Sequence, residues 1–342
     1  MNSDEIKKTI QTFFQDNTVT IVGSGLSLAE GIPGMSGLAS ELQYKITPLL
    51  KEPADTDIWA KISADLNSGI GLEQALHNTT PTPNIEDLIR AQTASFIGRS
   101  EENVLENILF HNKALRFSEY LKHFNIRNEG LTVITTNYDR LIEFACELNG
   151  IQVDTLFIGR YFAKYSPEQC KYQFCQNIRK HGTKIAIDYA PKVTVLKPHG
   201  CLSWHLVNGE PYSIPHAPFR HSLIITPGID KYKEGYNVPF DIHRAKANSA
   251  IDSALRYIII GYGFNDDHLE THLVRKLETG TPALILTHSI SDNARSLIKR
   301  CKNITAIYSD NKNGSIVMTN SAEYEFPDLI LWDLKEMLKE VF

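Results

Sequence analysis

Short apolar runs recur along the chain, separated by stretches in which apolar residues have the spacing of a helix. The runs are rich in β-branched residues, which predicts buried strands. They lie at residues 18–22, 131–135, 193–196, 222–226, 257–260 and 283–286. Buried strands that alternate with helices indicate a parallel sheet covered on both faces. The pattern therefore predicts an α/β fold with a Rossmann-like parallel sheet and helices on both sides.

Two segments interrupt this alternation. Residues 51–128 are rich in helix formers and contain no convincing strand, which predicts a large helical insertion. Residues 151–192 predict a smaller, irregular insertion. We therefore expect residues 1–50 and 129–342 to form the main domain, ending in a strand at 315–319 and a helix at 329–341.

Composition and net charge argue against some classes of function. The chain has 342 residues and a formal net charge of −5, so it is too acidic for a protein whose main role is to neutralise nucleic-acid phosphates. We expect no direct nucleic-acid binding. The apolar runs are far shorter than the roughly 20 residues of a membrane span, and residues 1–15 have no apolar core of a signal peptide. The sequence therefore predicts a cytoplasmic protein with no membrane association.

Two glycine turns follow predicted strands. Gly23-Ser24-Gly25 lies between a strand and a helix, where bare backbone N–H groups receive a pyrophosphate. Leu28 stands where the dinucleotide fingerprint has its third glycine, so a turn that only closes the strand is the alternative. The second turn, residues 261–264, would form another nucleotide-cradling loop, or a bulge in which Phe264 packs on the core.

Polar side chains follow two other predicted strands. Asn137 and Asp139 come after residues 131–135, where an amide can hold a water molecule or a ribose hydroxyl, or cap a helix. His199 follows residues 193–196 in a tight turn between Pro198 and Gly200, which makes it the best general-base candidate. The carboxyl ends of parallel strands share one edge of the sheet, so these side chains are expected to meet there.

The order of these motifs resembles the sirtuin-like NAD-binding family, and most of all the bacterial sirtuin-like domains of anti-phage defence systems. The motifs that carry the resemblance are Gly23-Ser24-Gly25-x-Ser27 with Gly31-Ile32-Pro33, Thr136-Asn137-Tyr138-Asp139, Lys197-Pro198-His199-Gly200, and Gly261-Tyr262-Gly263-Phe264-x-Asp266. The likeness spans about residues 18–289.

The resemblance implies a role in NAD binding or cleavage for each motif. Asn137 and His199 correspond to the catalytic residues of the family, and Asp139 to a polar residue beside the ribose. The remaining residues implied to contact NAD are Gly23, Ser24, Gly25 and Ser27 at the pyrophosphate, Ile32 and Pro33 at the nicotinamide, Gly261, Tyr262, Gly263 and Phe264 at the phosphates and adenine ribose, and Thr287 and His288 at the adenosine end.

One departure from the family sets the expected chemistry. Protein-deacylating sirtuins hold a structural zinc with two Cys-x-x-Cys pairs, whereas Cys201 is the only cysteine between His199 and Gly261, and the five cysteines form no such pair. We therefore expect no zinc module and no metal. The resemblance then implies an NAD glycohydrolase that uses NAD as its substrate and releases nicotinamide and ADP-ribose. A non-enzymatic NAD or ADP-ribose binding module and a zinc-free NAD-dependent deacylase are the alternatives.

The resemblance also implies how such an activity is controlled. An unregulated NAD hydrolase would deplete the cofactor of its own cell. We therefore expect a homo-oligomer, gated by assembly or by a separately encoded partner such as a HerA-type ATPase or another phage sensor, with NAD depletion and abortive infection as the outcome.

Overall fold

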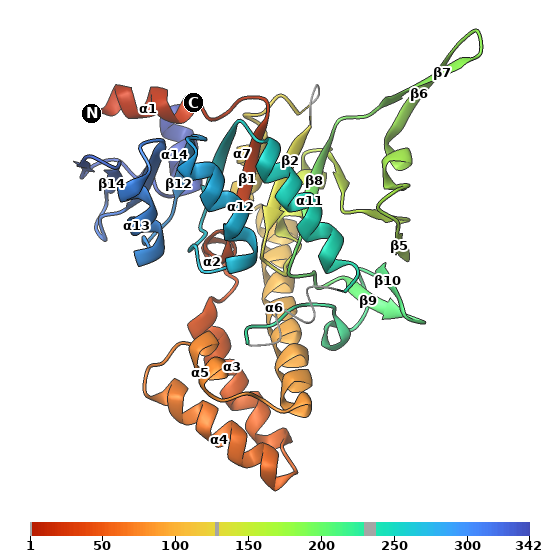
Figure 1. The fold of residues 1–342 in the computed structure, drawn as a ribbon, viewed down its shortest axis with the longest axis vertical. Helices are drawn as coiled ribbons and strands as arrows, with labels where there is room; N and C mark the ends of the chain where they lie inside the picture. The colour runs from red at the N-terminus through yellow and green to blue at the C-terminus, as the bar shows by residue number, and fades with distance from the viewer. Residues whose placement is uncertain (1, 127–129, 229–236) are drawn as a thin grey trace.

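The computed structural model describes residues 2–126, 130–228 and 237–342. A nine-stranded sheet in the order β15-β14-β13-β12-β11-β1-β2-β8-β3 runs through the molecule (Figure 1). Its strands are β1 (Thr18–Val22), β2 (Leu131–Thr135), β3 (Gln152–Asp154), β8 (Lys192–Leu196), β11 (Arg256–Ile260), β12 (Ala283–Leu286), β13 (Ile304–Ser309), β14 (Ser315–Met318) and β15 (Glu323–Phe326). The strands from β13 to β3 are parallel, and only β14 and β15 pair antiparallel. The predicted parallel sheet is confirmed.

Helices cover both faces of this sheet. One face packs against α1 (Ser3–Gln11), α7 (Arg116–Leu121), α9 (Leu141–Leu148) and α14 (Leu334–Val341), and the other against α11 (Phe240–Ser253), α12 (Asp267–Glu278) and α13 (Asp292–Arg300). Successive residues of a strand point to opposite faces, so Ile258 joins the first core and Ile259 the second. Burial on both faces explains why the strands are apolar throughout, and the predicted fold class is confirmed.

The strand order places a ligand site at one edge of the sheet. From β1 in the middle, the chain adds β2, β8 and β3 on one side and β11, β12 and β13 on the other. The connections therefore diverge at the carboxyl end of β1, and open α/β sheets bind ligands in the crevice at such a switch point. The short helix α2 (Ser24–Glu30) begins there, directly after β1.

A helical layer extends from this edge (Figure 1). It consists of α3 (Met35–Ile46), the 3₁₀ turn η1 (Thr47–Leu49), α4 (Pro53–Asn67), α5 (Leu72–Asn78) and the first half of α6 (Pro83–His111). Leu42, Trp59, Leu76 and Ile85 form part of its own hydrophobic core. The layer thus begins at Met35, earlier than residue 51, and the second half of α6 and all of α7 pack in the main core. Within the described ranges, no helix combines the length and apolar character that crossing a membrane requires.

Residues 151–192 contain more regular structure than expected. β3 extends the main sheet, while β4 (Phe157–Ile158) and β5 (Ala163–Tyr165) pair with β9 (Trp204–Val207) and β10 (Glu210–Ser213) in a small antiparallel sheet. After the 3₁₀ turn η2 (Cys170–Phe174), β6 (Cys175–His181) and β7 (Lys184–Tyr189) form a hairpin that extends away from the body of the molecule (Figure 1). Ile178 and Ile185 on this hairpin are 68% and 67% exposed.

The prediction of a strand at residues 222–226 is wrong. Only Ile224 forms a bridge, with Gly200, and the segment follows the 3₁₀ turn η3 (Phe219–His221). Its backbone bonds to the loop after β8 and to β9 instead of to the main sheet. Ile225 N donates to His199 O (2.9 Å), Cys201 N donates to Leu223 O (3.2 Å), and Leu223 N donates to Trp204 O (2.7 Å). The apolar run is therefore buried beside the β8 loop and helps to hold His199 in place.

Candidate active site

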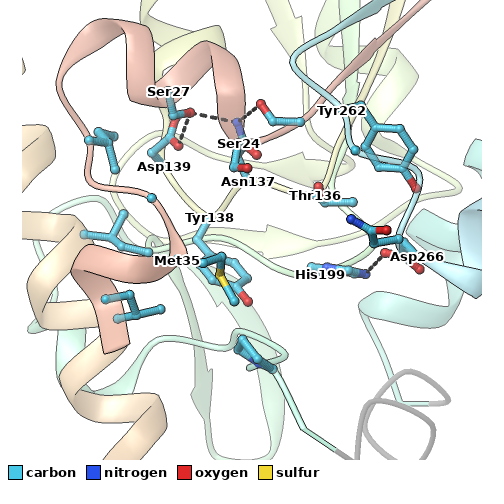
Figure 2. A pocket seen from close by; sticks show the side chains of 18 of the residues that line it. Ser24, Ser27, Met35, Thr136, Asn137, Tyr138, Asp139, His199, Tyr262 and Asp266 are labelled. Atoms are coloured by element: carbon cyan, nitrogen blue, oxygen red, sulfur yellow. Dashed lines mark hydrogen bonds and ion pairs between the residues drawn. The ribbon is translucent and has the colours of Figure 1, made fainter. Parts of the chain in front are cut away.

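A cavity of about 240 Å³ lies at the carboxyl edge of the sheet, where β1, β2, β8 and β11 end (Figure 2). Ten residues predicted from the motifs line it. These are Gly23, Ser24, Ser27, Ile32, Pro33, Asn137, Asp139, His199, Tyr262 and Gly263. Residues that lie far apart in the sequence meet here because each follows a strand of the same parallel sheet.

Helices supply cavity residues that the sequence analysis missed. Met35 and Leu38 come from α3, Glu73 from α5 and Ile97 from α6. The three apolar side chains among them give the same pattern whether they face a core or a cavity, so no signal in the sequence separates the two cases. The cavity is therefore shared between the sheet and the helical layer.

Gly25 and Gly261 are not among the cavity-lining residues, because they face each other. A Cβ added at Gly25 would lie 2.7 Å from the Gly261 Cα, and one added at Gly261 would lie 2.6 Å from the Gly25 Cα. Gly261 also has a φ of +58°, which glycine adopts readily. The two glycines thus let the β1 and β11 loops touch backbone to backbone, which differs from the expected approach to a pyrophosphate.

The same contact uses backbone donors that were expected to be free. Gly23 N donates to Ile260 O (2.9 Å) and Gly25 N donates to Gly261 O (3.0 Å). Two N–H groups of the first glycine turn are therefore already bonded inside the protein. Ser24, which is exposed and lines the cavity, is the residue of this turn that is placed to meet a ligand.

Gly25→Val is expected to destabilise the fold rather than act only on ligand binding. The larger side chain would overlap the Gly261 backbone, and such overpacking costs roughly 1–3 kcal/mol or more. Gly71→Val is the matched control, because Gly71 has open space around its Cβ position and an extended backbone. Thermal unfolding should show a clear loss for Gly25→Val and little change for the control. Equal melting temperatures with weaker NAD binding would instead support the direct pyrophosphate role.

The other predicted ligand residues lie outside the cavity. Phe264 is 1% exposed and packs edge-on against Tyr262, with ring centroids 5.2 Å apart, so it serves the core. Thr287 and His288 follow β12 on the same edge of the sheet, and the His288 ring packs against Trp332 (4.8 Å). Neither of these two lines the cavity.

The Asn137 side chain is held in one orientation by its neighbours. Its Nδ2 donates to Gly23 O (2.9 Å) and to Ser27 Oγ (2.7 Å). Because both amide hydrogens are used, Oδ1 is the atom of this side chain that remains for a ligand. Asn137 is therefore placed to accept a hydrogen bond from a water molecule or hydroxyl group in the cavity.

Asp139 supports this arrangement. Ser27 Oγ donates to Asp139 Oδ2 (2.7 Å), and Leu141 N donates to Asp139 Oδ1 (3.2 Å). Both carboxylate oxygens thus have partners inside the protein, and the residue is 4% exposed. Asp139 sets the direction of the Ser27 hydroxyl, which in turn accepts from Asn137 (Figure 2).

His199 pairs with a carboxylate that the sequence analysis did not single out. His199 Nε2 lies 2.6 Å from Asp266 Oδ2, and both residues line the cavity (Figure 2). At this distance the two side chains form an ion pair when the His199 ring is protonated. Such a pair is the arrangement in which a histidine is oriented for proton transfer.

Asp266 was visible in the sequence as the last residue of the fourth motif. An aspartate just before a helix is typical of a cap, and Asp266 does precede α12. Its backbone N–H donates to Glu270 Oε1 (2.6 Å). The pairing with His199 was not predictable, because β8 and β11 are separated in the sheet by β2 and β1.

The cysteines show no metal-binding arrangement. Cys146, Cys170, Cys201 and Cys301 are buried thiols, and Cys175 is exposed; none forms a disulfide. In the part of the chain that the structure describes, no group of three or more His, Cys, Asp or Glu side chains is placed to hold a metal ion.

Comparison with known proteins gives a family and a set of similar structures. The family model described as SIR2-like domain matches residues 131–307, just over half of the chain. No curated protein sequence matches.

Solved sirtuin structures resemble the chain at low identity. A structure described under sirtuin substrate affinity is 15% identical, with a TM-score of 0.44, covering 100% of this chain and 98% of that one. A Sir2 homologue in complex with NAD is 13% identical, with a TM-score of 0.43, covering 89% and 87%. A Sir2 complex with a p53 peptide and NAD⁺ is 15% identical, with a TM-score of 0.41, covering 100% and 97%. Because the family model covers more than half of its length, the chain belongs to the SIR2-like domain family.

Proposed function

We propose that the protein is an NAD glycohydrolase, which cleaves the nicotinamide–ribose bond of NAD⁺ with water. The observation that carries the proposal is that one cavity holds both an oriented amide, Asn137, and a histidine paired with a carboxylate, His199 with Asp266. A module that only binds NAD needs no such acid–base pair. Membership of the SIR2-like family and the NAD complexes named among the similar structures support NAD as the substrate.

Different residues of the cavity would contact different parts of NAD. Ile32 and Pro33 give one wall an apolar surface that suits a nicotinamide ring. Ser24 offers a hydroxyl group at the first glycine turn, where we place the pyrophosphate. The loop after β11, with Tyr262 and Gly263, would border the phosphates and the adenine ribose. Thr287, which lies outside the cavity at the end of β12, would meet the adenosine end.

The proposed reaction breaks the bond between ribose C1′ and the nicotinamide nitrogen. The electron pair of this bond leaves with nicotinamide. As this bond lengthens, C1′ gains oxocarbenium character and a water molecule attacks it. Asn137 Oδ1 would orient this water or a ribose hydroxyl, and His199 would accept the proton that the attacking water loses. NAD⁺ and water thus yield nicotinamide, ADP-ribose and a proton, with no metal or reductant required.

Nicotinamide release, measured by chromatography in three parallel reactions, tests the proposal. The protein is incubated with NAD alone, with NAD plus an acetylated peptide, and with NAD plus its genomic-neighbour partner. We expect nicotinamide release in the absence of peptide. Release only with the peptide would favour the zinc-free deacylase, and intact NAD in all three reactions would favour the binding module.

We further propose that the protein acts in anti-phage defence in the cytoplasm, by depleting NAD when infection is sensed. This rests on the likeness of its motifs to bacterial sirtuin-like defence proteins. Because unregulated hydrolysis would harm the host, we propose gating by homo-oligomerisation or by a separately encoded partner such as a HerA-type ATPase. The fraction of oligomer, measured by native mass spectrometry, and the rate of NAD turnover are compared over the same protein concentrations. The two should rise together if assembly controls the activity.

A further inference from the structure

Lys197 connects the two loops that carry the proposed catalytic residues. It follows β8 directly, two residues before His199, and its side chain is only 1% exposed. The ammonium donates to the backbone carbonyl oxygens of Asn137 (3.4 Å) and Asp139, and it forms an ion pair with Glu143 Oε1 (3.1 Å). A buried charge is tolerated only when it is paired in this way.

The surroundings of Lys197 keep it charged. Burial alone would lower the pKa of the Lys197 ammonium. The nearby carboxylates of Glu143 and Asp139, together with the hydrogen bond to Glu143, act against burial, and the pKa of Lys197 is raised overall. The side chain therefore stays protonated at neutral pH and keeps all three hydrogens for its partners.

We propose that Lys197 is a positioning residue, which fixes the backbone of the loop with Asn137 to the strand end that carries His199. Lys197 does not line the cavity, so it acts through the residues it holds. Its own backbone N–H donates to His243 Nδ1 (3.2 Å) on α11, which anchors the β8 end of this connection. The expected loss of kcat for NAD rests on the proposed function, whereas the restraint that Lys197 places on the loop does not.

The test compares Lys197→Met with Lys192→Met. Lys192 lies at the other end of β8 and also pairs with a buried carboxylate, Asp154, away from the cavity. For Lys197→Met we expect hydrogen exchange of the amides at residues 136–141 to rise roughly tenfold, because a charged hydrogen-bond donor to this loop is lost. We also expect kcat for NAD to fall about 10–100-fold through misplacement of Asn137, while the Kd for NAD changes less than about threefold. Lys192→Met should change none of these.

Two outcomes would overturn the inference: unchanged exchange at residues 136–141, or a kcat within about twofold of wild type despite faster exchange. If Lys197→Met does not fold, Lys197→Met/Glu143→Gln removes both charges of the ion pair together and takes its place in the same comparison. If the wild-type protein does not turn over NAD, the proposed function fails, and hydrogen exchange alone decides whether Lys197 restrains the loop.

Discussion

His199→Ala is expected to lower the rate of NAD hydrolysis about 10²–10⁴-fold, the usual cost of losing a general base. The ring lies at a strand end, faces the cavity and is held by Asp266, so its removal should leave the fold and much of the NAD affinity intact. Turnover and NAD binding are measured on the same preparation. His205→Ala is the matched control, because His205 is a buried histidine that bonds to a backbone carbonyl and does not line the cavity.

The variant Asp266→Asn tests whether Asp266 acts through His199. If Asp266 acts by orienting His199, the substitution should slow hydrolysis in the wild-type background but add little once His199 is alanine. Independent, additive losses would show that Asp266 has a separate role. Hydrolysis by His199→Ala at a rate near wild type would refute the general-base assignment.

Asn137→Ala is expected to lower kcat for NAD by about 10²-fold or more, because the attacking water or the ribose hydroxyl loses its acceptor. The loss should appear in kcat more than in affinity. Ser27→Ala should give a smaller loss of the same kind, since the Ser27 hydroxyl links the Asn137 amide to Asp139.

Asn149→Ala provides the control for Asn137. The Asn149 amide also donates two hydrogen bonds, here to the backbone carbonyls of Ser118 and Ala145, at the end of α9 and away from the cavity. Its substitution should change stability and leave turnover unaltered. Equal kcat values for Asn137→Ala and wild type would exclude Asn137 from the reaction.

Polar residues that follow parallel strands were the most predictable part of the site. Asn137 and His199 each come directly after an apolar run, and the sheet brings such positions to one edge. The strands themselves were predictable because both faces of the sheet are covered, which makes them continuous apolar runs. Residues 222–226 gave the same signal and formed no strand, since an apolar run can also be buried beside a loop.

Contacts across the sheet were the less predictable part. A glycine gives the same signal whether it makes room for a ligand or for another backbone, so the contact between Gly25 and Gly261 had no sign in the sequence. Lys197 and Asp266 stood inside recognised motifs, yet their partners lie on other elements. Burial of a lysine and pairing of an aspartate are properties of the assembled sheet.

The most direct measurement is NAD hydrolysis in water enriched in oxygen-18, with the products identified by mass spectrometry. If water attacks ribose C1′, ADP-ribose should carry one heavy oxygen atom, nicotinamide should carry none, and the two should form in equal amounts. His199→Ala, under the same conditions, should form both far more slowly. Intact NAD at every assembly state and with the partner present, or a product without the heavy oxygen, would contradict the proposal that this protein is an NAD glycohydrolase.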